Sequence, residues 1–101
     1  MYRATTPTHT FELPFEYEQF VTKILITYKQ GSKIVLEKTE TDDITVNGKT
    51  VSYQLTQAET KLFEKDIIVD IQIRVLTNGG QSIASQEWRM LVNDVLNDKE
   101  L

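Results

Sequence analysis

The stretch KDIIVDIQIRVLT, residues 65–77, decides the fold class of this chain. Its apolar side chains recur at every second position, which is the period of a β-strand and not of a helix. The residues of the more apolar face are Ile67, Val69, Ile71, Ile73 and Val75. The other face includes Asp70, Gln72 and Arg74, so the pattern predicts a long strand with one buried face. Such a face has to be covered by a second layer of structure.

Shorter stretches of the same period lie on both sides, separated by turn signals. In chain order they are THTFEL (8–13), EQFVTKILITYKQ (18–30), KIVLEKT (33–39), ITV (44–46), KTVSYQL (49–55) and QSIASQEWRMLVNDVL (81–96). The turn signals are Gln30–Ser32, Asn47-Gly48 and Asn78–Gly80. Asn47-Gly48 predicts a two-residue hairpin with a type I′ turn. In the last stretch Gln86 breaks the alternation, and a β-bulge near residues 85–87 accounts for it.

About seven short strands without βαβ spacing predict an all-β fold, an immunoglobulin-like antiparallel β-sandwich. Residues 1–101 form one domain, with a flexible N-terminal arm over residues 1–7 and a frayed tail over residues 97–101. The predicted structural core is Ile26, Leu36, Tyr53, Phe63, Val69, Ile71, Ile73 and Trp88. We expect Trp88 at the centre of this core, Phe20 on the buried face of its strand, and Ile34 pointing inward beside Leu36.

The stretch LTQAETKLF, residues 55–63, is the one piece that does not alternate. It predicts a short helical turn near residues 56–64. Thr56 and Glu59 have the spacing of a capping box, in which each side chain accepts a hydrogen bond from the backbone amide of the other residue. We expect this turn to carry the chain from one sheet to the other, with Leu62 and Phe63 closing the end of the core. A docking element is the alternative interpretation.

Composition excludes several classes of function. The chain has 101 residues and 0 cysteines, so disulfides, thiolate catalysis and cysteine-based zinc sites are excluded. Its 11 basic residues are scattered among 15 acidic ones, a distribution that argues against nucleic acid as a partner. No apolar run approaches the length of a membrane span, and the N-terminal residues lack the apolar region of a signal peptide. We therefore expect synthesis and retention in a cytoplasm, with no membrane partner.

No constellation of residues predicts chemistry. His9 is the only histidine, no nucleophile-elbow sequence is present, and a partly buried or interface role is expected for this residue. Asp42 and Asp43 form an acidic loop that is either solvated or a cation site, although their spacing matches no calcium-binding pattern. We predict no catalytic residue, no metal and no cofactor, so the chain is not expected to be an enzyme.

Four segments together resemble a known group of proteins. TTPTHTFELPF, ITYKQGSKIVLEK, LTQAETKLF and VDIQIRVLTNGGQSIASQ are similar to short, uncharacterised structural proteins of tailed phages and prophages of Gram-positive bacteria. The resemblance covers most of the chain, from Thr6 to about Leu96, and its motifs are structural. It implies a non-catalytic protein of the tail, baseplate or neck. Its partners would be other virion proteins, with a homo-oligomer as a further possibility. Such a protein would be found in the bacterial host cytoplasm during synthesis and then in the virion.

Two further expectations follow from the residues. Lys33–Thr39 is expected to be an edge strand that discourages uncontrolled pairing and still permits addition of a partner strand. The alternative to an assembly role is a β-sandwich binding module that recognises a cell-surface glycan or protein. Such a module would display aromatic side chains in its loops, and the candidates are Tyr2, Phe15 and Tyr17.

Overall fold

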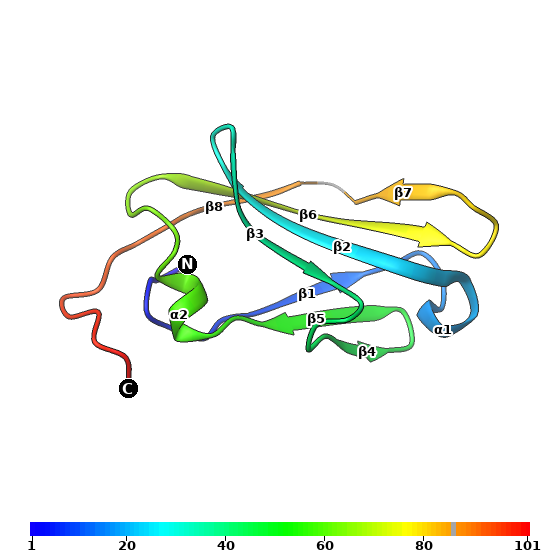
Figure 1. The fold of residues 1–101 in the computed structure, drawn as a ribbon, viewed down its shortest axis with the longest axis horizontal. Helices are drawn as coiled ribbons and strands as arrows, with labels where there is room; N and C mark the ends of the chain where they lie inside the picture. Colours follow the sequence, from blue (N-terminus) through cyan, green and yellow to red (C-terminus); the bar gives the residue numbers. More distant parts are fainter. Residues whose placement is uncertain (86) are drawn as a thin grey trace.

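The computed structural model describes residues 1–85 and 87–101, which fold into two packed β-sheets (Figure 1). The elements are, in order, β1 (Thr8–Glu12), α1 (Tyr17–Phe20), β2 (Val21–Gln30), β3 (Lys33–Thr39), β4 (Thr45–Asn47), β5 (Thr50–Gln54), α2 (Gln57–Thr60), β6 (Ile68–Thr77), β7 (Ser82–Ala84) and β8 (Trp88–Leu91). The bulge predicted near residues 85–87 involves Gln86, which lies outside the described residues.

The smaller sheet has the strand order β1-β5-β4, and the larger sheet has the order β3-β2-β6, with β7 and β8 both paired to the far edge of β6. All of these pairings are antiparallel, as predicted for an all-β sandwich. An immunoglobulin sandwich of the constant type has strands A, B, E and D in one sheet and C, F and G in the other. Here β1, β5 and β4 take the places of B, E and D. Within the described residues, the place of strand A is empty.

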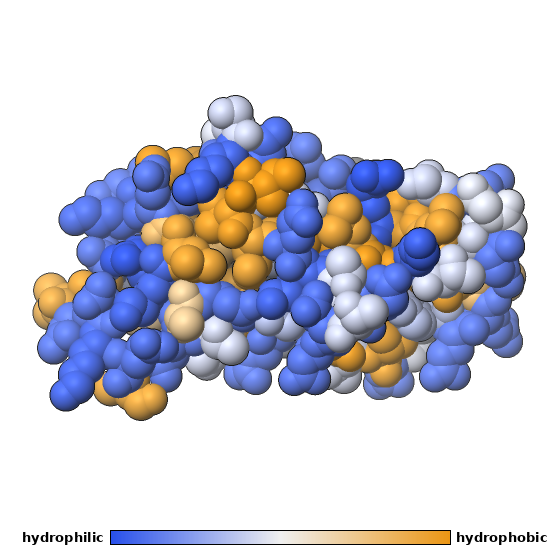
Figure 2. Space-filling view, in the orientation of Figure 1, coloured by the Kyte–Doolittle hydropathy of each residue, from blue (hydrophilic) through white to orange (hydrophobic). Residues whose placement is uncertain are grey.

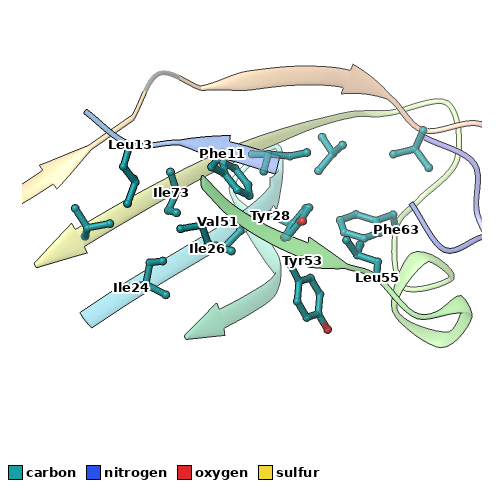
Figure 3. Packing of buried hydrophobic residues seen from close by; sticks show 14 residues of the cluster. Phe11, Leu13, Ile24, Ile26, Tyr28, Val51, Tyr53, Leu55, Phe63 and Ile73 are labelled. Atoms are coloured by element: carbon teal, nitrogen blue, oxygen red, sulfur yellow. The ribbon is translucent and has the colours of Figure 1, made fainter. Parts of the chain in front are cut away.

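The core lies between the two sheets (Figure 3). Its buried apolar residues are Phe11, Leu13, Ile24, Ile26, Tyr28, Val51, Tyr53, Leu55, Phe63, Val69, Ile71, Ile73, Val75 and Val92. Six of the eight predicted core residues belong to this set. Five of them lie on β2, β5 and β6, where alternation turns every second residue inward, and the sixth, Phe63, follows α2. Leu36 is partly buried and packs against the core. Burial of each large apolar side chain contributes about 1.5–3 kcal/mol.

Trp88 does not lie at the centre of the core, and that prediction was wrong. Its side chain is 40% exposed, although it points inward from β8 opposite Ile71. The parity of the strand was therefore predicted correctly. The indole remains partly exposed because, among the described residues, no strand of the smaller sheet faces β8 to cover it.

The inward assignment of Ile34 was also wrong, and the reason is local. Ile34 is 51% exposed because the register shifts between Tyr28 and Lys29 of β2: Leu36 lies opposite Tyr28, while Ile34 lies opposite Lys29. A β-bulge at Val35 turns Ile34 to the outer face. On the face shown in Figure 2, apolar surface gathers where β3 runs in Figure 1.

The structure also changes the details of two short elements. Residues 17–20 form the one-turn helix α1 rather than the start of β2, and Phe20 at its end is 43% exposed. The hairpin between β4 and β5 is confirmed, but the type I′ turn is not. Asn47 pairs with Thr50 as the last residue of β4, and positive φ falls on Gly48 alone, at 60°. Leu62 is 58% exposed, so Phe63 closes the end of the core without it.

The terminal segments make defined contacts. Tyr2 pairs in parallel with Asn93, and the amide of Arg3 donates to the carbonyl of Asn93 at 2.9 Å. The guanidinium of Arg3 donates to the carbonyl of Phe63 at 3.0 Å and to the carboxylate of Asp94 at 2.8 Å. These bonds place the first three residues beside the end of β8, in the segment predicted to be a flexible arm.

Candidate functional site

The larger sheet extends one strand beyond the smaller one, and this difference creates the candidate site. It has four strand positions, β3, β2, β6 and β7/β8, against three in the smaller sheet. His9 of β1 reaches Tyr28 of β2, and Phe11 of β1 packs on Trp88 with ring centroids 4.8 Å apart. Strand β1 therefore faces the middle of the larger sheet. Strands β7 and β8 overhang a strand position that no described residue occupies, which we call the β1 slot.

Two hollows mark the two ends of the β1 slot. The first has a volume of 220 Å³ and is lined by Thr8, His9, Thr10, Phe11, Ile71, Trp88 and Met90. The second has a volume of 140 Å³ and is lined by Glu12, Leu13, Pro14, Ile73, Val75, Ile83, Ala84 and Ser85. From the first hollow to the second, the lining residues continue along β1 and its end, along β6, and from β8 to β7. Both hollows therefore belong to the same groove along the edge of β1.

The free edge of β1 presents backbone groups to the slot. The amide of Leu13 donates to the carbonyl of Lys49 at 2.7 Å, and the carbonyl of Pro7 accepts from the amide of Leu55 at 2.9 Å. Odd-numbered residues of this strand therefore bond to the β5 side. Because backbone groups alternate in direction along an antiparallel strand, those of Thr8, Thr10 and Glu12 point into the slot. They have no backbone partner among the described residues.

His9 lies at the inner side of the slot. Its Nδ1 is 2.7 Å from the hydroxyl of Tyr28, and the tautomer decides which of the two groups donates. Burial, followed by the charge of the N-terminal ammonium, lowers the pKa of His9 below the usual value of 6.5. Burial also raises the pKa of Tyr28. Both side chains are therefore neutral near pH 7, and within the described chain His9 hydrogen-bonds a tyrosine rather than a serine nucleophile.

A second polar cluster joins the two sheets at α2. The predicted capping box is confirmed: the amide of Glu59 donates to Thr56 Oγ1 at 3.1 Å, and the amide of Thr56 donates to Glu59 Oε1 at 2.9 Å. The same carboxylate accepts from the hydroxyl of Tyr53 at 2.7 Å and from Lys38 Nζ at 2.6 Å. Lys38 also lies 5.2 Å from the centre of the Tyr53 ring. The cluster thus ties β3, β5 and α2 together.

The charges in this cluster are stabilised in their ionised forms. Burial alone would raise the pKa of Glu59, but hydrogen bonds from Lys38, the Thr56 amide and Tyr53 outweigh it and hold that pKa below its usual value. The hydrogen bond to Glu59 raises the pKa of Lys38. Only 14% of the Glu59 side chain and 17% of the Lys38 side chain are exposed. Both carboxylate oxygens of Glu59 accept hydrogen bonds within the fold, so the cluster acts as a structural joint between the sheets.

The acidic loop after β3 is organised by its own backbone. Asp42 Oδ2 accepts from the amide of Thr39 at 2.7 Å, and the amide of Asp42 donates to the carbonyl of Thr39 at 3.0 Å. Asp43 is exposed. In the part of the chain that the structure describes, no three His, Cys, Asp or Glu residues are placed to hold a metal ion together.

Comparisons with protein-family models, with curated proteins and with solved structures find no match. Among the described residues, no helix has the length and apolar character needed to cross a membrane.

Proposed function

We propose that this chain is a non-catalytic structural or assembly protein of a tailed phage or prophage, acting through protein–protein contacts in the virion. The observation that carries the proposal is the free edge of β1 beside an apolar groove. Unpaired backbone groups on an edge strand are a ready template for association with another chain. Trp88, Met90 and Ile83 give that edge an apolar flank that the fold itself does not cover completely.

Strand β3, an edge strand of the larger sheet, differs from β1 in ways that disfavour association. Strand β3 carries Lys33 and Lys38 and contains the bulge at Val35. Charged side chains and bulges are the usual protection of an edge strand. Strand β1 has no lysine, no internal proline and no register shift with β5. Addition of a partner strand, expected from the sequence at residues 33–39, is therefore better supported at β1.

The polar chemistry of the described residues supports a role without catalysis. Every buried side-chain nitrogen or oxygen of these residues has a hydrogen-bond partner within the fold. Glu59, Lys38 and Tyr53 bond to one another, and His9 bonds to Tyr28. A catalytic site would instead direct such groups toward a substrate.

Assignment to a virion rests on the resemblance to phage structural proteins. The test is to produce particles from a host that carries the gene in its natural neighbourhood, purify them on a density gradient, and detect this chain with an antibody. We expect the chain to sediment with the particles, and deletion of its gene to abolish complete particles. Intact, infective particles that lack the chain would overturn the proposal.

One observation favours the alternative, a binding module for a cell-surface glycan. Trp88 is an exposed aromatic side chain beside a hollow of 220 Å³, and aromatic faces are common in recognition sites. The candidates named from the sequence are less suitable, since Phe15 packs on Phe20 with ring centroids 5.7 Å apart. A shift of Trp88 fluorescence on addition of cell-wall oligosaccharides, without particle association, would favour the glycan module over the assembly role.

A further inference from the structure

We infer that the β1 slot receives one extended strand donated by a different protein, which pairs antiparallel with β1 and completes the smaller sheet. The inference rests on the proposed function, because it supplies the partner contact that an assembly protein requires. It specifies the recognition mode, the width of the site and the side-chain pattern of the donor strand.

The width of the slot fits a single strand. Neighbouring strands in a sheet lie about 4.8 Å apart and packed sheets about 10 Å apart, so one overhanging position accommodates one strand. Two copies cannot pair symmetrically through their β1 strands. In such a dimer the larger sheet of the second copy, with its overhanging β8, would overlap the space already filled by β6 and β8 of the first copy. The hollows, at 220 and 140 Å³, are smaller than the usual pockets of about 300–1,000 Å³ for drug-sized ligands. They suit the separate side chains of a strand.

The backbone of β1 offers an antiparallel partner its full set of hydrogen bonds. Thr8, Thr10 and Glu12 each direct an amide and a carbonyl toward the slot. A donor residue opposite each of them would complete a hydrogen-bonded pair. This is strand addition to an exposed sheet edge, in which main-chain bonds give affinity and alternate side chains give specificity.

The side chains around the slot define the pattern of the donor. Residues directly opposite each other in an antiparallel pair point to the same face, so donor residues opposite His9, Phe11 and Leu13 would point into the sandwich. There they would meet the apolar groups of Met90, Trp88 and Ile83.

Donor residues opposite Thr8, Thr10 and Glu12 would face water, as these three side chains do. The chain carries a net charge of −4, and Glu12 is exposed at this edge, so a lysine or arginine opposite Glu12 is favoured. The donor therefore alternates apolar and polar residues and carries a cation.

A second copy of this chain does not offer such a segment. Its alternating apolar stretches within the described residues already form the two sheets. Its remaining tail, residues 92–101, has exposed Leu96 and Leu101, which lie on opposite faces of an extended chain. The tail is also acidic, which disfavours pairing beside Glu12. These features point to a different protein, whose donor strand carries a basic residue.

The test uses a synthetic hexapeptide and the single tryptophan of the chain. Acetyl-Val-Lys-Val-Thr-Val-Thr-amide places valines opposite Leu13, Phe11 and His9, and lysine opposite Glu12. The control, acetyl-Val-Val-Lys-Thr-Val-Thr-amide, exchanges two residues and breaks the alternation. We expect a saturable blue shift of Trp88 emission, since the donor covers an indole that is 40% exposed. We expect affinity for the control to be at least about tenfold weaker, or about 1.4 kcal/mol.

Two variants of Thr10 separate strand addition from other modes of binding. Thr10→Pro removes the amide that points into the slot without removing a bond to β5, and proline is tolerated at such an edge position. Thr10→Ala keeps this amide, and both variants lose the 3.0 Å hydrogen bond between the hydroxyl groups of Thr10 and Ser52. We expect Thr10→Ala to bind the peptide like the original chain and Thr10→Pro to bind at least about tenfold more weakly.

Hydrogen exchange on the unmodified chain gives an independent result if Thr10→Pro does not fold. We expect saturating peptide to slow exchange of the Thr8, Thr10 and Glu12 amides while leaving the β3 edge unchanged. Equal binding of both peptides, or no protection of the three amides at peptide concentrations up to about 1 mM, would overturn the inference. A concentration-dependent dimer that Thr10→Pro abolishes would also overturn it, because the donor would then be a second copy.

The outcome for the slot is distinguishable from the outcome for the proposed function. If the chain sediments with particles and the Thr10→Pro variant does so equally, the assembly role stands and the slot inference fails. If the alternating peptide binds as expected but the chain is absent from infective particles, the slot stands and the virion role fails.

Discussion

Replacement of Glu59 by glutamine tests the joint between the two sheets. The change keeps the shape of the side chain and an acceptor oxygen for the Thr56 amide, but it removes the charge that faces Lys38. The ion pair has a distance of 2.6 Å and is about five-sixths shielded from water, so its loss costs more than that of a surface pair.

The expected cost can be worked out from the contacts. Hydrogen bonds to charged groups contribute about 1.5–3 kcal/mol each, and Glu59 accepts such bonds from Lys38 and Tyr53. Glutamine retains part of the bond to Tyr53, and Lys38 can turn its ammonium group toward water. We therefore expect destabilisation of about 1–3 kcal/mol for Glu59→Gln, and about 1 kcal/mol more for Glu59→Ala because the capping box is lost.

The effect should depend on pH with a defined sign. The pKa of Glu59 is lowered in the folded chain, so the stabilisation is fully present above the unfolded value of about 4.3 and is lost as pH falls through the folded value. The difference in stability between the original chain and Glu59→Gln should be largest near pH 7. It should shrink below about pH 4.

The assay is urea unfolding followed by far-ultraviolet circular dichroism at pH 7 and pH 3, with Glu37→Gln as the control. Glu37 is an exposed residue of the same strand as Lys38 and makes no ion pair among the described residues. Surface changes of this kind usually alter stability by less than about 0.5 kcal/mol. A Glu59→Gln variant as stable as this control at pH 7, or a difference independent of pH, would show that the Glu59–Lys38 pair does not stabilise the joint between the sheets.

Three further predictions follow from burial, backbone geometry and titration. Phe63→Ala should lower the free energy of unfolding by about 3–5 kcal/mol, measured by urea unfolding, because Phe63 is only 1% exposed. Trp88→Ala should cost less, because Trp88 is 40% exposed. Equal losses would place Trp88 in the core after all. Gly80→Ala should lower stability by about 1 kcal/mol, since its φ is 83°, while Gly79→Ala meets only ordinary contact and should change the melting temperature little. The pKa of His9, measured by nuclear magnetic resonance, should lie below 6.5. The contribution of His9 to stability should be fully present above its unfolded pKa and be lost as pH falls through its lower folded pKa. A measured pKa above 6.5 would contradict the burial of this side chain.

Much of the fold follows from local patterns in the sequence. The alternation along residues 67–75 identifies the inward face of β6, and the spacing of Thr56 and Glu59 identifies the helix cap. Both features depend on residues only two or three positions apart. The bulge at Val35 defeats the same reasoning in β3, because it places Ile34, which precedes it, on the opposite face from Leu36, which follows it.

The candidate site depends on relations between distant elements and was missed. Burial of Trp88 would need a further strand in the smaller sheet, which the described residues do not supply, and no pattern within residues 81–96 reports this. Likewise, Lys38 and Tyr53 meet Glu59 only after the two sheets pack. One signal was available: THTFE lies between two prolines and has none of the lysines that protect KIVLEKT, which marks it as the less protected edge.

An empty β1 slot is compatible with a stable domain, and this determines how a donor strand would act. Water can satisfy the backbone groups of Thr8, Thr10 and Glu12, whereas every buried side-chain polar atom of the described residues is already bonded within the fold. Trp88 rests on Phe11 and partly covers the core without a donor. The donor would therefore not be needed for folding. It would bind a preformed edge and raise stability by ligand linkage, which makes the contact reversible until further partner surfaces are engaged.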